Sequence, residues 1–213
     1  MVDDKTKDTV KEIKQSFRLL MNGVTAQSLR EKGLDYHLNW GASLLHLREM
    51  AAEYAQDHSV AQELWKEDVR ECKILATMLM PVEGFDYSLA MLWIEQTKTQ
   101  EIAEIACMNL YCRLPFAKDL ALQLVSSADE LKLVHGFNIL SRLFAGVRDG
   151  NGELSVSETN EFLDQALCSL QEEKVAVRHS AMNAIQRFAD IDEECYMLAK
   201  GALKTIKMED WLI

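Results

Sequence analysis

The amino-acid sequence predicts an all-α protein, a right-handed α-solenoid built from antiparallel pairs of short helices. Three observations carry this prediction. Apolar residues recur at three- and four-residue steps through most of the chain, which is the period of an α-helix. Only 2 prolines and 9 glycines occur in 213 residues, so few positions interrupt a helix. No segment alternates polar and apolar residues long enough to predict a strand.

The first helix is predicted over residues 9–21, where Val10, Ile13 and Phe17 share one face. After it, Ser28 and Glu31 have the spacing of a capping box. We therefore expect a short turn of helix there, ending at the next glycine.

The helices that follow have start and stop signals of their own. Residues 42–56 carry an amphipathic pattern, and Ser59 is the expected N-cap of a short helix after them. Pro81 marks the end of the next helix, because proline cannot continue one. Later starts are marked by Asp86, Thr99, Pro115 and Asp129.

The last third of the chain predicts three more helices, over residues 157–171, 173–189 and 192–206, which makes about ten or eleven in all. The middle segment, EKVAVRHSAMNAIQRFA, places Arg178 after a valine pair and resembles the second helix of a HEAT repeat. Helix pairs recur roughly every 35 to 45 residues, as in helical solenoids. We therefore expect one HEAT-like repeat domain over residues 1–213.

The charge balance is acidic, with a formal net charge of −11 and a sequence pI near 4.9. Such a chain has no general attraction to phosphate backbones, although a local basic stripe is compatible with it. The acidity favours a basic partner.

The chain lacks the signs of export. Its first residues, MVDDKTKDTVKEIKQSF, have no basic and apolar regions of a signal peptide, and no apolar run reaches membrane-spanning length. We expect a cytoplasmic monomer without a membrane anchor. The five cysteines have no CxxC spacing and are interpreted as reduced thiols within helices: Cys72, Cys107, Cys112, Cys168 and Cys195.

Three segments in the first half carry a resemblance to a known family. They are LHLREMA (residues 45–51), AQELWK (61–66) and RECKILATML (70–79), in that order. Together with their surroundings they resemble the front part of the DNA alkylation repair family, the AlkD-like HEAT-like repeat proteins. The resemblance implies a curved all-helical shell that binds damaged DNA in a concave groove. In active members it also implies an N-glycosylase that removes cationic alkylpurines.

The resemblance singles out Trp93 as the candidate catalytic residue. Active members are similar in carrying a tryptophan followed four residues later by an aspartate, and Trp93 matches the tryptophan. The aspartate position is Thr97, whose hydroxyl carries no charge to stabilise a developing oxocarbenium ion. Alkylpurine DNA glycosylase activity is therefore an open question. The apolar context LAMLW also allows Trp93 to be a core residue.

A candidate DNA-binding patch consists of Lys66, Arg70 and Lys73, which lie on adjacent turns. The three cations alternate with acidic residues that include Glu63 and Glu67. The same pattern is typical of a solvated face with salt bridges.

The stretch DGNGELSVSE, residues 149–158, partly matches a calcium-binding loop, but its first ligand position is Val147. Ser155 and Glu158 also have capping-box spacing, so an interhelical turn is the favoured interpretation. The histidines are scattered, and phosphate-binding and nucleophile motifs are absent from the sequence. We expect neither a metal nor a cofactor.

Two functions remain at this stage. The first is a DNA alkylation repair protein that binds damaged DNA, with or without glycosylase activity. The second is a non-catalytic α-solenoid scaffold that binds a basic protein partner, which the net charge of −11 favours.

Overall fold

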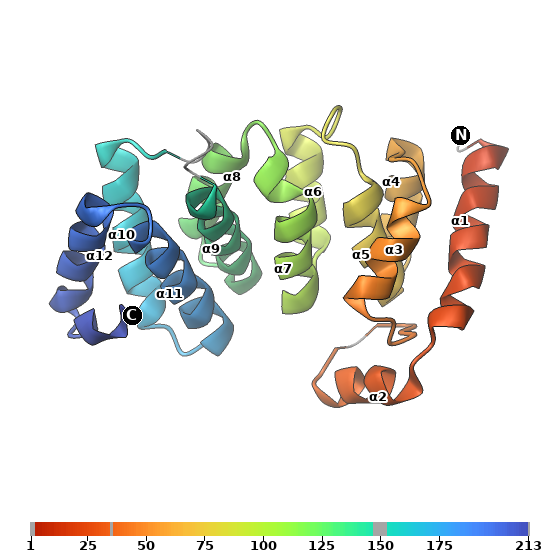
Figure 1. The fold of residues 1–213 in the computed structure, drawn as a ribbon, viewed down its shortest axis with the longest axis horizontal. Coiled ribbons are helices and arrows are strands. Elements are labelled where there is room, and N and C mark those ends of the chain that lie inside the picture. Colours follow the sequence, from red (N-terminus) through yellow and green to blue (C-terminus); the bar gives the residue numbers. More distant parts are fainter. Residues whose placement is uncertain (1–2, 35, 147–152, 213) are drawn as a thin grey trace. The chain divides into compact units, whose positions relative to one another are not determined.

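The computed structural model describes residues 3–34, 36–146 and 153–212, and within these residues it contains twelve α-helices and no strand. The all-α prediction is confirmed, with slightly more helices than expected (Figure 1). The helices are α1 (Asp4–Ser16), α2 (Gly23–Glu31), α3 (Leu44–Ala52), α4 (His58–Lys66), α5 (Arg70–Leu79), α6 (Tyr87–Gln96), α7 (Gln100–Asn109), α8 (Ala117–Val125), α9 (Glu130–Ala145), α10 (Val156–Leu170), α11 (Val175–Ala189) and α12 (Glu193–Thr205). The described residues also contain the 3-10 turns η1 (Phe17–Leu20), η2 (Tyr111–Arg113) and η4 (Glu209–Trp211).

Contacts divide the chain into two compact units, Met1–Phe85 and Asp86–Ile213. The single-domain organisation expected from the sequence stays a prediction. No helix among the described residues is long and apolar enough to cross a lipid bilayer.

Helix starts follow the local capping chemistry. The predicted caps Asp86, Thr99 and Asp129 each accept a hydrogen bond from the backbone N–H three residues later. Two predicted caps are wrong. Ser28 lies inside α2, which begins earlier because Asn22 caps it, and Ser59 lies inside α4, which Asp57 caps.

In unit 1, α1 packs on α4, and both α3 and α4 pack on α5. The segment before α3 is fixed to the start of α5 by an isolated parallel bridge between Leu38 and Val69. Glu71, fully buried, accepts hydrogen bonds from the backbone N–H groups of Trp40 (3.1 Å) and Ala42 (3.2 Å). This carboxylate holds the loop between α2 and α3 in one place.

Gly41 allows this loop to approach the start of α2. Its φ is +71°, and a β-carbon there would lie 2.3 Å from the carbonyl oxygen of Asn22. The backbone N–H of Asn22 in turn donates to the carbonyl oxygen of Trp40 at 2.8 Å. A side chain at position 41 would break this contact, so the glycine is required by both conformation and space.

In unit 2, α9 packs against α7, α8 and α11 (Figure 1). Asn138 of α9 donates to Ser180 of α11, and Asn183 of α11 donates to Ser141 of α9, both at 3.1 Å. Each pair joins residues 42 positions apart, so the two helices run parallel with a repeat of that length. The register agrees with the repeat length expected from the sequence.

The core of unit 2 includes a cluster of three phenylalanines, Phe144, Phe162 and Phe188, from α9, α10 and α11. Their ring centroids are 5.1 to 5.6 Å apart in edge-to-face geometry. Such pairs contribute about 0.5–1.5 kcal/mol each beyond the area they bury. The cluster ties α10 to the parallel pair α9 and α11.

Candidate nucleic-acid interface

Trp93 is an interior residue of unit 2, with 2% of its surface exposed. Thr97 is also buried, at 7% exposure, and its hydroxyl donates to the carbonyl oxygen of Trp93 at 2.9 Å. Trp93 lies within α6 and Thr97 is the C-cap residue of that helix, and both side chains are buried. The structure therefore agrees with the alternative in which Trp93 is a core residue.

The structure places the three cations of the predicted DNA-binding patch, Lys66, Arg70 and Lys73, in different surroundings. Arg70 is buried and donates to the carbonyl oxygen of Ala42 (2.9 Å) and to Glu71 (3.1 Å). The ammonium group of Lys73 donates a hydrogen bond to the carbonyl oxygen of Trp65 and lies 4.6 Å from the centre of the Trp65 ring.

Of these three cations, only Lys66 is an exposed side chain, and it pairs with Glu63. Because α3 and α4 both pack on α5, the core takes the side that carries Arg70. DNA binding by these three residues stays a prediction.

The start of the DGNGELSVSE stretch lies outside the described residues, up to position 152. The rest contains the predicted capping box, in which the Ser155 hydroxyl accepts from the backbone N–H of Glu158 and the Glu158 carboxylate accepts from that of Ser155. Lys118, 2.9 Å from this carboxylate, lowers the pKa of Glu158 to about 2, together with the Ser155 hydrogen bonds. Glu158 is therefore engaged as a capping residue. Within the described residues, no three His, Cys, Asp or Glu side chains are grouped to hold a metal ion.

A polar hollow of about 210 Å³ lies between α9 and α11 in unit 2. Its lining comprises Asn138, Ser141, Arg142 and Ala145 from α9, and Asn183 and Arg187 from α11. Both asparagines that line the hollow donate the hydrogen bonds to serine described above. Because these amide and hydroxyl groups bond one another, they hold the two helices in register and leave the arginines at the surface.

Arg142 and Arg187 are both exposed and provide the positive charge of this hollow. Arg187 has Asp190 at 3.8 Å, one turn further along, a solvent-exposed pair that contributes little energy. A guanidinium offers a planar fork of donors that matches two phosphate oxygens. Local spacing could not predict this pair, because the two arginines are distant in the chain. The signal that could have predicted the arginine pair is the 42-residue register. It places Arg187 of α11 level with Ala145 of α9, which lies one helical turn after Arg142.

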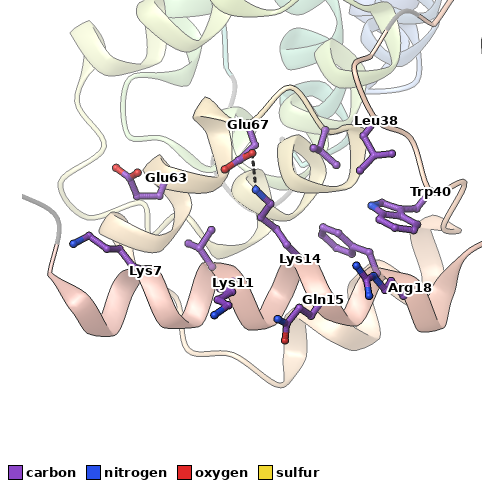
Figure 2. Close-up of a pocket in the computed structure, with 12 residues that line it drawn as sticks. Lys7, Lys11, Lys14, Gln15, Arg18, Leu38, Trp40, Glu63 and Glu67 are labelled. Atoms are coloured by element: carbon purple, nitrogen blue, oxygen red, sulfur yellow. Dashed lines mark ion pairs between the residues drawn. The ribbon is translucent and has the colours of Figure 1, made fainter.

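A larger groove of about 510 Å³ lies along α1 in unit 1 (Figure 2). Its cationic side is a stripe from one face of α1 and its continuation into η1: Lys7, Lys11, Lys14 and Arg18. These residues follow one another at steps of three or four, so each helical turn presents one positive charge. The acidic residues of the same helix, Asp4, Asp8 and Glu12, do not line the groove. Asp4 nevertheless forms an exposed ion pair of 2.9 Å with Lys7 of the stripe.

The other side of this groove contains Glu63 and Glu67 at the end of α4, and Leu38, Trp40 and Val69 near the start of α5. Lys14 and Glu67 form an ion pair of 2.8 Å across the groove. Figure 2 shows Glu63 opposite Lys7, and Trp40 beside Arg18 at the other end. The groove therefore offers four cations, two carboxylates and one half-buried indole.

Comparison with known proteins decides the family. A family model described as "DNA alkylation repair enzyme" matches residues 13–193. The chain belongs to the DNA alkylation repair family. The resemblance carried by the three segments of residues 45–79 is thus confirmed and extends over most of the chain.

One solved structure supports the fold of this family member. It belongs to a protein described as one of "a new family of proteins related to the HEAT-like repeat DNA glycosylases with affinity for branched DNA structures". The TM-score is 0.81 over 92% of this chain and 82% of that one, at 16% sequence identity. The HEAT-like repeat fold is therefore confirmed. A search of curated proteins gives no match.

The two surfaces relate differently to the family match. The hollow between α9 and α11 lies wholly within the matched residues, whereas Lys7 and Lys11 of the α1 groove precede them. The hollow thus belongs to the part of the chain that the family shares.

Proposed function

We propose that this member of the DNA alkylation repair family binds DNA, and that the hollow between α9 and α11 contacts the sugar–phosphate backbone. The observation that carries the proposal is the placement of Arg142 and Arg187 on two parallel helices, at the rim of one polar hollow. Phosphate contacts made by arginine supply the main, sequence-independent part of DNA affinity.

The charge of the whole chain makes this placement informative. In a protein with a net charge of −11, a chance surface patch is more often acidic than basic. Two guanidiniums beside amide and hydroxyl groups instead form a local site for an anion. Local charge, and not the net value, decides where a phosphate group binds.

We further propose that the preferred ligand is DNA with a damaged or distorted backbone. The structural relative named above is described as having affinity for branched DNA. A helical surface that presents fixed arginines reads the path of phosphate groups, so it responds to backbone geometry more than to base sequence.

A gel-shift assay at low salt tests this proposal. We expect wild-type protein to shift a four-way junction more strongly than a linear duplex of the same composition. The Arg142→Ala/Arg187→Ala double variant should weaken the shift at least about tenfold and reduce the salt dependence of binding, because each lost phosphate contact lowers the slope by about 0.9.

The matched control is Lys32→Ala/Lys204→Ala, which removes two exposed cations that line neither surface described above. It has the same charge change and should retain most of the affinity. An equal loss in both double variants would show that net charge alone governs binding, and would reject the hollow as the contact.

The same samples test base excision. DNA containing 7-methylguanine or 3-methyladenine is incubated with the protein and then assayed for abasic sites. Their release would assign a glycosylase, whereas recovery of intact bound DNA would assign a binding protein. With Trp93 and Thr97 buried, we expect binding without excision at that pair.

A scaffold for a basic protein partner is the second candidate, favoured by the net charge of −11. It predicts no shift with any DNA at low salt. That result would favour the scaffold and contradict the DNA proposal.

A further inference from the structure

The α1 groove of unit 1 has the components of a site for single-stranded DNA. Its cations stand in line along one helix, its volume of about 510 Å³ falls within the range of about 300–1,000 Å³ typical of ligand sites, and an indole closes one end. We propose that this groove binds a single DNA strand, with phosphates on the α1 stripe and a base stacked on Trp40. The proposal goes beyond the α9–α11 hollow and uses residues of the other unit.

The linear arrangement of the cations favours a strand over an isolated anion. Lys7, Lys11 and Lys14 rise along α1 by about 5–6 Å a turn, and Arg18 continues the line. A single phosphate would need the cations to converge on one point. A row of them instead follows successive phosphates of a flexible backbone, as in the positively charged grooves of proteins that bind single strands.

Trp40 supplies the second element of such a site. Its side chain is half-buried and lines the groove beside Arg18 (Figure 2). Bases stack on aromatic side chains with little sequence preference, because every base has a π-face. The bases of a duplex are already stacked on each other, so an aromatic platform favours a strand with free bases.

The backbone of Trp40 is held on both sides, which fixes the point from which the indole extends. Its N–H donates to the buried carboxylate of Glu71 at 3.1 Å, and its carbonyl oxygen accepts from the N–H of Asn22 at 2.8 Å. The next residue, Gly41, fits against the carbonyl oxygen of Asn22 with no space for a side chain. A loop held in this way loses little backbone conformational entropy when a base stacks on its aromatic side chain.

Glu67 competes with the strand for the central cation. It pairs with Lys14 at 2.8 Å, with side-chain exposures of 35% and 40%. Ion pairs that open to solvent contribute only about 0–1 kcal/mol, so a phosphate can replace the carboxylate. A ligand must displace Glu67 from Lys14, which lowers the affinity of the groove for any single phosphate. A strand with several phosphates compensates for this cost through its contacts with the other cations.

The test measures fluorescence anisotropy of a labelled oligothymidylate of roughly ten nucleotides at low salt. Lys11→Ala/Arg18→Ala should weaken binding on the order of tenfold or more, and should lower the salt slope by about 1.4, since each phosphate contact to a single strand contributes about 0.7. Trp40→Leu should weaken it between about five- and a hundredfold. Lys32→Ala/Lys204→Ala is again the control with matched charge and should bind as the wild type does.

Glu67→Gln gives a result that a folding defect cannot imitate, because it should tighten binding by up to about fivefold. Unchanged or weaker binding by this variant would overturn the proposal, as would equal losses in the groove variant and the charge control. Competition by inorganic phosphate at the same phosphate concentration as the oligonucleotide would assign a simple anion site and would also overturn it. Arg142→Ala/Arg187→Ala should leave oligothymidylate binding intact, so failure of this site and failure of the α9–α11 site are distinguishable.

Discussion

Gly136 of α9 lies against Val125 of α8 so closely that a β-carbon at position 136 would be 2.7 Å from Val125 Cγ1 and 2.9 Å from its backbone nitrogen. It would also lie 2.9 Å from the carbonyl oxygen of Ala121. Two of these three atoms belong to the backbone of α8 and cannot turn away. The missing side chain of Gly136 is what permits α8 and α9 to pack at this distance.

Gly136→Ala should lower the free energy of unfolding by up to about 2 kcal/mol, because an overpacking cost of about 1–3 kcal/mol outweighs the gain of about 1 kcal/mol in helix propensity. Gly201→Ala in α12 is the matched control, since no atom lies within 4 Å of its added β-carbon. That change should raise stability by about 0.5–1 kcal/mol. Urea denaturation of both variants measures the difference. Equal effects at the two positions would contradict the close packing of α8 on α9.

His135 should make unit 2 sensitive to mild acid. Burial lowers the pKa of His135 to about 4 from the ordinary 6.5, so the imidazole is neutral in the folded protein. The unfolded chain binds the proton first as pH falls below 6.5, and stability decreases until the pH reaches about 4. A shift of this size corresponds to roughly 3 kcal/mol.

His135→Phe should remove that part of the pH dependence while retaining most stability at pH 7, because Nε2 of His135 is buried without a hydrogen-bond partner among the described residues. Melting temperatures from pH 7 to pH 4 check the prediction. If the variant loses stability with acid as steeply as the wild type does, His135 is not the responsible group.

Glu71 should be the most sensitive carboxylate of unit 1. It is fully buried, lies 3.1 Å from the Arg70 guanidinium and accepts from two backbone N–H groups of the loop that carries Trp40. Glu71→Gln removes the charge that balances a buried guanidinium, a change that costs about 3–5 kcal/mol. Glu49→Gln, at an exposed position of α3, has the same chemistry and should be neutral. Chemical denaturation of the two variants provides the comparison, and similar stabilities would refute the assignment.

Thr97→Asp should not create a glycosylase. The new carboxylate would be buried near the C-terminal end of α6, where desolvation and the helix dipole both oppose it, so we expect a loss of about 1–3 kcal/mol. Thr97→Ser keeps the hydroxyl that donates to the carbonyl oxygen of Trp93 and should cost less than about 1 kcal/mol. Thermal melts and an abasic-site assay cover both readouts. Base release by a stable Thr97→Asp variant would show that this position faces the DNA after all.

The sequence by itself determined the local structure of this protein. The caps Asp86, Thr99 and Asp129 specify helix starts through interactions within a few residues, so they could be predicted without a fold. The apolar period of residues 9–21 predicted the first helix but not its bounds, because α1 begins at Asp4 and ends at Ser16, where the 3-10 turn η1 follows. The family could also be predicted, because three short segments of residues 45–79 resemble it, and the family model matches residues 13–193. The wrong caps at Ser28 and Ser59 show the limit, since Asn22 and Asp57 offer the same chemistry a few residues earlier.

Only the tertiary structure decided which helix faces are buried. The spacing of Lys66, Arg70 and Lys73 shows that they are neighbours, but α3 and α4 cover α5 and bury Arg70 against Glu71. Packing likewise turned Trp93 inward, brought Arg142 to the same hollow as Arg187, and set Trp40 beside the stripe of α1. Helical periodicity relates residues within one turn or two, whereas these relationships join residues far apart in sequence and depend on how helices stack.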